Sequence, residues 1–212
     1  MPPSLFVIIS LEVFKPVAQT QSLRCTTFLN SLTPKTYMAN DVVKLEYSKD
    51  LLVSEDSDLA RDLYSKFHYG LIENKKVQLH PMEALHLMER KKVNVFKGKK
   101  ELSFDAMVKL FQKSDERFWT KYVVFKNLRN RGYIVKTALK FGADFRVYDR
   151  GIKPGEDHAK WLVYAVTESE KCTWQEFSAK NRVANSTKKR LLIGIVDAEN
   201  DVTYYEIRWI RP

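Results

Sequence analysis

The chain changes from a helical to a strand-like pattern at Arg131-Gly132-Tyr133-Ile134-Val135-Lys136-Thr137. Before this stretch, apolar side chains recur at helical spacing and predict an amphipathic helix that runs to about residue 130 and ends at Gly132. Thr173 and Glu176 have the spacing of a capping box and predict one later helix at 173–181. Segments rich in β-branched and aromatic residues predict strands at 133–139, 145–148, 161–166, 191–196 and 202–209.

The first half of the chain mixes short strand-like and helical segments. Ser103 is a candidate cap for one helix, and Ser114 or Asp115 is a candidate cap for the long helix that follows it. The expected strands are 42–47, 51–53, 77–79 and 93–96, and the expected helices are 59–67, 82–90 and 104–113. We place a domain boundary near residue 117 and assign the fold to the α/β (α+β) class.

Length and charge set the broad class of the protein. The chain has 212 residues, which is enough for one large or two small domains with an adequate core. Its formal net charge is +10, and a basic balance favours polyanions, of which nucleic acid is the commonest. A solvated basic surface explains the same charge in proteins of many other functions, so charge alone leaves both readings open.

Cysteine usage and hydropathy indicate the compartment. Cys25 and Cys172 lie too far apart in sequence to form a metal-ligand pair, and they predict reduced thiols and a cytoplasmic location. The longest early apolar run, residues 5–14, is interrupted by Ser10 and Glu12 and is shorter than the roughly 20 residues of a transmembrane helix. It has no preceding basic flank and no clear cleavage site, so we expect neither a signal peptide nor a membrane span.

Three residues in the second half can carry acid–base chemistry. Tyr148 ends Phe141-Gly142-Ala143-Asp144-Phe145-Arg146-Val147-Tyr148, His158 lies in Glu156-Asp157-His158-Ala159-Lys160-Trp161-Leu162-Val163, and Lys189 lies in Ser186-Thr187-Lys188-Lys189-Arg190-Leu191-Leu192. A phenol, an imidazole and an ammonium can act as base, acid and charge stabiliser on an RNA phosphodiester without a metal. Each also has an ordinary explanation: a packing tyrosine, a polar residue at a strand entrance and a solvated basic patch.

These blocks follow one another in a familiar order. With Arg131 to Thr137 before them and Asp197-Ala198-Glu199-Asn200-Asp201-Val202-Thr203-Tyr204-Tyr205 after them, they resemble the archaeal tRNA-splicing endonucleases, the tRNA-intron endonuclease family. The resemblance covers roughly residues 38–212. It implies a small mixed N-terminal domain at 38–117 and a restriction-endonuclease-like catalytic domain at 118–212, with a central mixed sheet flanked by helices. Residues 1–37 lie outside it, either as an extension of unknown role or because Met38 is the true start.

The resemblance implies a reaction and a role for each residue. The substrate would be precursor tRNA, cut at exon–intron junctions in a bulge-helix-bulge RNA to leave 2′,3′-cyclic phosphate and 5′-hydroxyl ends. Tyr148 would be the general base on the 2′-hydroxyl, His158 the general acid on the departing 5′-oxygen, and Lys189 the stabilising cation. No metal and no cofactor is expected. A phenol with a pKa of about 10 is a poor base at neutral pH unless nearby positive charge lowers its pKa.

Other basic and aromatic residues are candidates for binding the RNA. The resemblance places Arg182 where the family clamps a flipped-out bulge base, and Trp209 is a candidate to stack on or beside that base, because guanidinium and aromatic planes grip unstacked nucleotides. Trp209 is as well explained as a core or interface residue of the last strand. Arg146, Lys188 and Arg190 are candidate phosphate contacts.

The acidic segment between the last two predicted strands is a candidate subunit contact. Asp197, Glu199 and Asp201 are by default only the polar residues of a hairpin turn. In the family, an acidic loop at this place inserts into a basic pocket of a neighbouring subunit. A chain that carries both this loop and the three catalytic candidates suits a homotetramer, and a heterotetramer with an inactive partner chain remains an alternative.

Two other functions compete with RNA cleavage. A structural subunit that only binds RNA is expected to have lost the catalytic residues, whereas all three are present here. A metal-dependent DNA nuclease on a similar sheet needs clustered carboxylates with a lysine close by. Asp144 and Asp157 are available for such a site, but the sequence shows no compact motif of two acids and a lysine on one strand.

Overall fold

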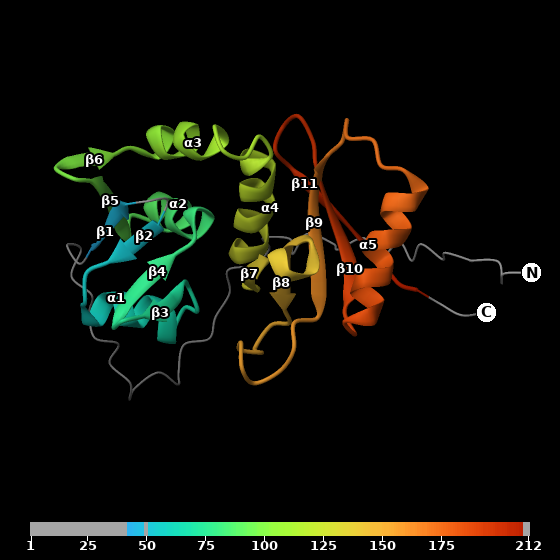
Figure 1. Ribbon diagram of the computed structural model, residues 1–212, viewed down its shortest axis with the longest axis horizontal. Coiled ribbons are helices and arrows are strands. Elements are labelled where there is room, and N and C mark those ends of the chain that lie inside the picture. The colour runs from blue at the N-terminus through green and yellow to red at the C-terminus, as the bar shows by residue number, and fades with distance from the viewer. Residues whose placement is uncertain (1–41, 49–50, 210–212) are drawn as a thin grey trace, which may run out of the picture.

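The computed structural model describes residues 42–48 and 51–209 and has two mixed α/β halves that lie side by side (Figure 1). The N-terminal half comprises β1 (Val43–Ser48), β2 (Leu51–Ser54), α1 (Asp58–Ser65), β3 (Leu71–Glu73), β4 (Lys76–Leu79), α2 (Pro81–Glu89), β5 (Val93–Lys97), β6 (Lys100–Leu102) and α3 (Phe104–Gln112). The C-terminal half comprises α4 (Phe118–Asn130), β7 (Ile134–Ala138), the short 3₁₀ helix η1 (Leu139–Phe141), β8 (Ala143–Tyr148), β9 (Trp161–Thr167), α5 (Trp174–Ser186), β10 (Arg190–Val196) and β11 (Val202–Ile207).

Each half is built on one mixed sheet. The N-terminal sheet has six strands in the order β3-β4-β2-β1-β5-β6, and the C-terminal sheet has five in the order β11-β10-β9-β8-β7. The parallel pairs are β1 with β5 and β9 with β10, and the other neighbours are antiparallel. Two mixed sheets with helices confirm the α/β (α+β) class that the sequence predicts.

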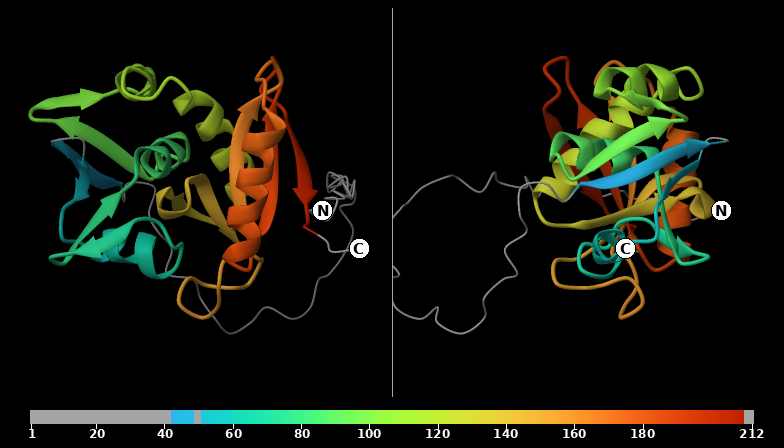
Figure 2. Two further views of the ribbon diagram at one scale, coloured as in Figure 1. Left: turned by 45° about the vertical axis from the view of Figure 1, so that its right-hand side comes forward. Right: turned by 90° about the vertical axis from the view of Figure 1, so that its left-hand side faces the viewer.

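The C-terminal sheet is covered on both faces, as expected. Alternate strand residues pack on α4, and the residues between them pack on α5, which follows from the period of two along a strand (Figures 1 and 2). Phe145 and Val147 belong to the cluster that includes α4, while Leu162 and Leu191 belong to the cluster beneath α5. This arrangement leaves the loop between β8 and β9 at one end of the sheet, beside the C-terminal end of α5 (Figure 2).

Helix starts follow the expected caps in two cases and differ in one. Ser103 accepts a hydrogen bond from the third residue of α3, and Thr173 with Glu176 forms the predicted capping box of α5. The prediction that Ser114 or Asp115 caps α4 is wrong, because the cap position is Arg117 and no side-chain cap hydrogen bond forms. The Asp115 carboxylate instead accepts from the backbone N–H of Arg117 at 3.0 Å, and the Ser114 hydroxyl donates to a carbonyl of α3.

Element ends differ from the prediction where tertiary contacts decide them. Helix α5 continues to Ser186, five residues beyond the predicted end at 181, because Asn181 and Ala184 are buried against the sheet. Strand β11 ends at Ile207, so Trp209 follows the strand rather than lying on it. The predictions for residues 1–37 and for Cys25 concern residues outside the described part of the chain. No helix in the described ranges is both long and apolar enough to cross a membrane.

The two halves share one core and a buried ion pair. The larger hydrophobic cluster runs continuously from the N-terminal sheet through α2, α3 and α4 to the C-terminal sheet. Beside it, the Lys136 ammonium on β7 donates to the Glu83 carboxylate on α2 at 3.1 Å and to the Gly70 carbonyl at 2.9 Å. Glu83 also accepts from the backbone N–H groups of Gly70 and His80, both at 3.0 Å. The predicted boundary near residue 117 therefore lies between α3 and α4 without interrupting the core.

Candidate active site

Tyr148, His158 and Lys189 line one open pocket of about 360 Å³ at the end of the C-terminal sheet. They come from three separate places: the end of β8, the loop before β9 and the turn before β10. These three places meet because β9 is the neighbour of both β8 and β10. The remaining lining residues are Phe141, Arg146, Gly155, Glu156, Asp157 and Ala159.

Tyr148 forms a buried wall of the pocket. It is the last residue of β8, it is 5% exposed, and it lies opposite Ile134 of the edge strand β7. Because residues two apart on a strand face the same side, Arg146 lies on the same sheet face as Tyr148. The sheet thus fixes a phenol and a guanidinium next to each other, both directed toward one pocket.

His158 is exposed and stands near the end of the loop that joins β8 to β9. Its backbone N–H donates to the Asp157 carboxylate at 2.6 Å. Within the loop, the N–H of Ile152 donates to the Asp149 carbonyl and that of Glu156 to the Lys153 carbonyl, both at 3.1 Å. The loop is therefore shaped by its own backbone hydrogen bonds, and it presents the imidazole at the rim of the pocket.

Lys189 is held by the C-terminal end of α5. Its backbone N–H donates to the Ala184 carbonyl at 2.9 Å, a helix-ending bond that becomes possible because Lys188 adopts a φ of 55°. The Lys189 ammonium donates to the Thr187 carbonyl at 2.9 Å and lies 5.2 Å from the centre of the Phe141 ring. The negative end of the helix dipole and an aromatic face both favour a cation at this place.

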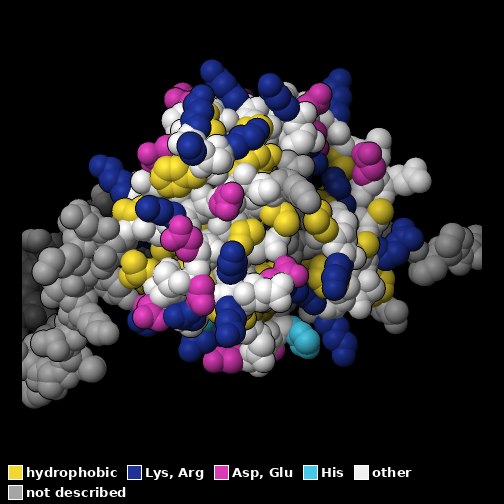
Figure 3. All heavy atoms as spheres, turned by 60° about the vertical axis from the view of Figure 1, so that its left-hand side comes forward, with side chains coloured by type: hydrophobic (Ala, Val, Ile, Leu, Met, Phe, Trp, Pro, Cys, Tyr) yellow, Lys and Arg dark blue, Asp and Glu magenta, His cyan; other side chains and the backbone are white. Residues whose placement is uncertain are grey.

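Charge in the pocket is mostly basic at its wall and acidic at its rim. Arg146 lines the pocket, and its Nε atom is buried without a hydrogen-bond partner among the described residues. Glu156 and Asp157 lie on the loop side, and Glu156 is 3.8 Å from the Lys153 ammonium. On the face seen in Figure 3, basic side chains are scattered between acidic ones rather than gathered in one stripe. This face therefore shows no basic stripe that would mark an RNA surface, and the pocket is the better guide.

The other predicted RNA-binding residues are not part of this pocket. Arg182 is exposed on α5, Lys188 is exposed in the turn that precedes Lys189, and Trp209 is partly buried beyond β11. Arg190 is held on the sheet, where its guanidinium donates to the Glu206 carboxylate at 3.0 Å. Of the five predicted contacts, only Arg146 lines the pocket together with the three catalytic candidates.

The acidic turn lies at the opposite end of the same strand. It joins β10 to β11 and projects from the far end of the sheet (Figure 1). Because a strand rises about 3.3 Å per residue, the seven residues of β10 separate Lys189 from Asp197 by roughly 25 Å. The Asp197 carboxylate accepts from the N–H groups of Glu199 at 3.0 Å and Asp201 at 2.8 Å, so it shapes the turn itself. The side chains of Glu199 and Asp201 form no ion pair among the described residues.

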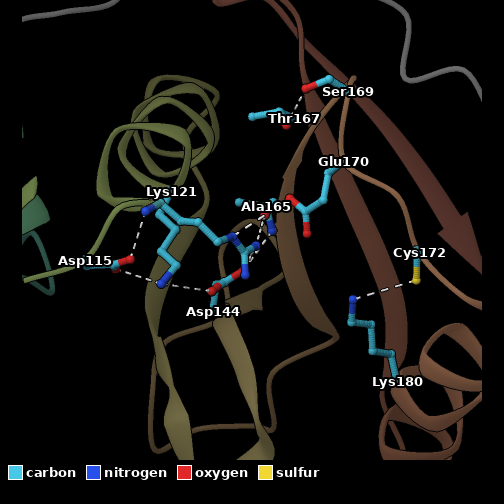
Figure 4. Close-up of polar contacts among 10 residues, drawn as sticks. Asp115, Lys121, Asp144, Ala165, Thr167, Ser169, Glu170, Cys172 and Lys180 are labelled. Atoms are coloured by element: carbon cyan, nitrogen blue, oxygen red, sulfur yellow. Dashed lines mark hydrogen bonds and ion pairs between the residues drawn. The ribbon is translucent and has the colours of Figure 1, made fainter.

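The two carboxylates considered for a metal site do not meet. Asp144 lies at the other end of β8 from Tyr148, where its carboxylate accepts from the Ala165 N–H at 2.9 Å (Figure 4). The Lys121 ammonium and the Arg117 guanidinium each lie 3.6 Å from it. Asp157 is in the pocket loop instead. Nowhere in residues 42–48 or 51–209 do three or more His, Cys, Asp or Glu side chains gather as metal ligands.

The sequence does not predict the roles of two residues, one in the pocket and one beside it. Phe141 and Lys160 both lie inside the quoted blocks, but no role could be assigned to them from spacing. Phe141 meets Lys189 only because η1 and the end of α5 come together in space. Lys160 bonds to neighbours of both Tyr148 and Lys189, through pairings that arise from sheet order. Aromatic and basic residues beside a motif are too common in sequences to indicate a role at the site.

Comparison with protein families gives two matches that cover most of the chain. Residues 43–108 match the family described as "tRNA intron endonuclease, N-terminal domain". Residues 118–204 match the family described as "tRNA intron endonuclease, catalytic C-terminal domain", and this range contains the whole pocket.

Curated relatives agree with the family matches. The "tRNA-splicing endonuclease" of Thermococcus onnurineus (strain NA1) is 41% identical over 169 residues, which cover 80% of this chain and 97% of the relative. That of Methanothermobacter thermautotrophicus is 39% identical over 170 residues, covering 80% and 99%. That of Nanoarchaeum equitans (strain Kin4-M) is 40% identical over 148 residues, covering 67% and 94%.

Proposed function

This chain belongs to the tRNA intron endonuclease family, and we propose that its pocket cleaves precursor tRNA by acid–base catalysis without a metal. The protein is an endonuclease of tRNA introns, as the catalytic-domain match and the relatives indicate. The observation that carries the mechanism is the convergence of Tyr148, His158 and Lys189 from three elements on one pocket. The expected junction is a bulge-helix-bulge RNA, which exposes unstacked nucleotides to such a pocket.

The proposed reaction is an internal transfer at phosphorus. The ribose 2′-oxygen attacks the adjacent phosphorus while its proton passes to the phenolate form of Tyr148, and the bond from phosphorus to the 5′-oxygen breaks. His158 donates a proton to that departing oxygen, so the products are a 2′,3′-cyclic phosphate and a 5′-hydroxyl. Lys189 stabilises the extra negative charge on the phosphoryl oxygens in the transition state. No group outside the pocket is needed to balance the step.

The pocket offers positive charge where the mechanism needs it. A phenol transfers its own proton readily at neutral pH only when cations stabilise its anion. Arg146 and Lys189 line the same pocket as Tyr148, and the Arg146 Nε atom has no hydrogen-bond partner in the described residues. We assign to Arg146 a contact with the scissile phosphate. Arg182 and Trp209 remain proposed contacts for a bulge base, Lys188 a proposed phosphate contact, and Arg190 a weaker one because Glu206 already holds it.

We further propose that the active form is a tetramer of this chain, with a heterotetramer as the alternative. Two exposed carboxylates of the acidic turn, Glu199 and Asp201, lie at the opposite end of β10 from the pocket of their own protomer. A candidate receiver on a neighbouring copy is a pocket of about 360 Å³ between α1, α2 and β7. Its lining includes the basic residues Lys66, Arg90, Lys92 and Arg129. Opposite charges on loop and pocket fit a subunit contact of this kind.

The direct test of the mechanism is His158→Ala on a bulge-helix-bulge RNA. We expect a cleavage rate lower by about 100-fold or more, the usual effect of losing a general acid, with RNA affinity little changed. A substrate whose departing 5′-oxygen is replaced by sulfur needs no protonation and should largely restore the rate. The matched control is His80→Asn, which changes a histidine outside both pockets and keeps a side chain that can cap α2. A variant that sulfur fails to rescue would show that His158 is not the acid.

A further inference from the structure

Lys160 connects the three elements that carry the catalytic candidates. Its backbone N–H donates to the Val147 carbonyl at 2.9 Å, directly before Tyr148. Its carbonyl accepts from the Arg190 N–H at 2.9 Å, directly after Lys189. Lys160 also lies two residues after His158 in the chain. One residue is therefore bonded beside two of the catalytic candidates and lies two positions from the third in sequence.

The Lys160 side chain closes the loop that carries His158. Its ammonium forms an ion pair with the Asp149 carboxylate, and Asp149 directly follows Tyr148. This hydrogen bond from Lys160 is the main reason that the pKa of the Asp149 carboxyl lies below its usual range. The stem of the loop is further fixed because the Lys160 ammonium lies 4.5 Å from the centre of the Trp161 ring. Neither Asp149 nor Lys160 lines the pocket.

We infer that Asp149 and Lys160 are positioning residues that hold His158 at its working distance from Tyr148. The inference rests on the proposed roles of these two catalytic candidates. The segment between Asp149 and Lys160 contains Gly151 and Gly155, both at positive φ, so its backbone has few side chains to restrict it. An ion pair at the base of such a loop limits how far its two ends separate. When the two ends of the loop are held together in this way, the loop holds the His158 imidazole in place.

The pair should affect the reaction more than the fold. Both side chains are about one-third exposed, and ion pairs of that kind contribute little to global stability. Catalysis is far more sensitive, because a misplacement of about 1 Å can lower a rate by about 100-fold. We therefore expect a loss of cleavage rate with almost no change in melting temperature or in RNA affinity.

A competing explanation is that Lys160 simply attracts RNA phosphate. That explanation predicts weaker RNA binding in Lys160→Met, and no harm or even tighter binding in Asp149→Asn. The positioning role predicts that both single variants lower the cleavage rate alike, and that the double variant is no worse than either. The two explanations therefore predict different effects of Asp149→Asn, because Asp149 is an acid and cannot attract phosphate.

The experiment is a double-mutant cycle on single-turnover cleavage of a bulge-helix-bulge RNA. We expect Lys160→Met, Asp149→Asn and their combination each to lower the rate roughly tenfold, within the range that small misplacements produce. Lys160→Arg should keep most of the rate because it keeps the charge. The matched control is Lys153→Met, which removes one positive charge from the tip of the same loop, where Lys153 lies 3.8 Å from Glu156. The control should leave the rate nearly unchanged.

A substrate with a sulfur leaving group shows whether the pair acts through His158. Because that substrate needs no acid, the three pair variants should cleave it at close to the wild-type rate. Additive losses in the cycle, an unchanged rate in Asp149→Asn, or a lower RNA affinity confined to Lys160→Met would each overturn the positioning role. A wild-type protein that fails to cut the RNA would instead overturn the proposed function itself, and this outcome is distinct because it appears before any substitution is made.

Discussion

Lys189 is the most firmly anchored side chain in the pocket. The Thr187 carbonyl accepts from its ammonium at 2.9 Å, and the ring of Phe141 lies beneath it. Both contacts orient the ammonium and leave its remaining N–H donors free to turn toward the pocket. In the proposed mechanism, this fixed cation would stabilise the negative charge that develops on the phosphoryl oxygens.

His86 is one buried residue that should make the fold sensitive to acid. It is 1% exposed, it packs on Tyr69 and Phe125, and neither ring nitrogen has a hydrogen-bond partner among the described residues. Burial lowers the pKa of His86 to about 4 from its usual 6.5. Between these two values the unfolded chain binds a proton that the folded chain does not, so stability falls as pH falls through this window. At pH 4.5 this difference in proton binding lowers the free energy of unfolding by about 2 to 3 kcal/mol.

Replacing this imidazole should remove that sensitivity. We expect His86→Leu to be more stable than the wild type at pH 4.5 by about 2 kcal/mol, and nearly equal to it or slightly more stable at pH 8. Urea unfolding at the two pH values measures the difference. Parallel stability curves for the two proteins would show that His86 does not titrate differently in the folded state.

The sequence predicts the three catalytic candidates because each lies in a distinctive linear block. The same blocks contain Phe141 and Lys160, whose roles it does not predict. Those roles depend on which strands become neighbours: Lys160 reaches Val147 and Arg190 only because β9 lies between β8 and β10. Linear spacing identifies reactive groups, whereas the groups that position them are fixed by the packing of the chain.

At the level of elements, β10 separates the two functional ends of the catalytic half. The pocket begins where β10 begins, and the acidic turn begins where β10 ends. The turn keeps its shape through hydrogen bonds to the Asp197 carboxylate and through Asn200, whose side chain accepts from the Trp119 indole at 2.8 Å. Only Glu199 and Asp201 are then available to carry charge toward another molecule.

Neutralising the tip of the acidic turn should therefore separate subunits without unfolding the turn. We expect Glu199→Gln with Asp201→Asn to convert a tetramer into dimers, because charge complementarity at a subunit contact is lost. Asp197 is left unchanged, since its carboxylate holds the backbone of the turn. Native mass spectrometry or sedimentation measures the change in assembly.

A charge-matched control separates this effect from a general change in net charge. Glu73→Gln with Glu101→Gln removes the same charge from exposed residues of β3 and β6 and should leave the assembly unchanged. If the turn variant stays tetrameric and fully active, the acidic segment is only a solvated hairpin turn.

The prediction of elements from sequence fails where local preference and tertiary contact disagree. Three of the residues from 181 to 186 (Asn181, Asn185 and Ser186) are weak helix formers, yet α5 includes them because Asn181 and Ala184 are buried. Strands β3 and β6 are each only three residues long, which is too short for alternation to be visible. The longer strands of the catalytic half were predictable because they are rich in β-branched and aromatic residues.

At the level of the whole molecule, the halves are joined by a shared core and by ion pairs of two kinds. The pair between Lys136 and Glu83 is buried, with side chains 13% and 6% exposed. A second pair, between Lys126 on α4 and Glu89 on α2, is 2.9 Å long, with side chains 43% and 28% exposed. Both ion pairs link the N-terminal half to the catalytic half, so the effects of breaking each pair on stability can be compared directly.

Loss of the buried lysine should weaken the whole fold. We expect Lys136→Met to lower the free energy of unfolding by about 3 kcal/mol, because it leaves the Glu83 carboxylate buried without its cation. Lys126→Met is the matched control and should cost about 0.5 kcal/mol, as exposed pairs do. Chemical unfolding at neutral pH measures both. Equal effects of the two substitutions would mean that the buried pair is no more important than the surface one.

The proposed mechanism depends on cleavage without a metal. The measurement that tests it most directly is single-turnover cleavage of a bulge-helix-bulge RNA in excess chelator. The pocket holds a phenol, an imidazole and an ammonium, and its two carboxylates, Glu156 and Asp157, belong to no cluster of three or more potential metal ligands among the described residues. We predict that the rate persists in chelator and that the products carry 2′,3′-cyclic phosphate and 5′-hydroxyl ends. Loss of activity that magnesium restores, or products with 3′-hydroxyl and 5′-phosphate ends, would contradict the mechanism.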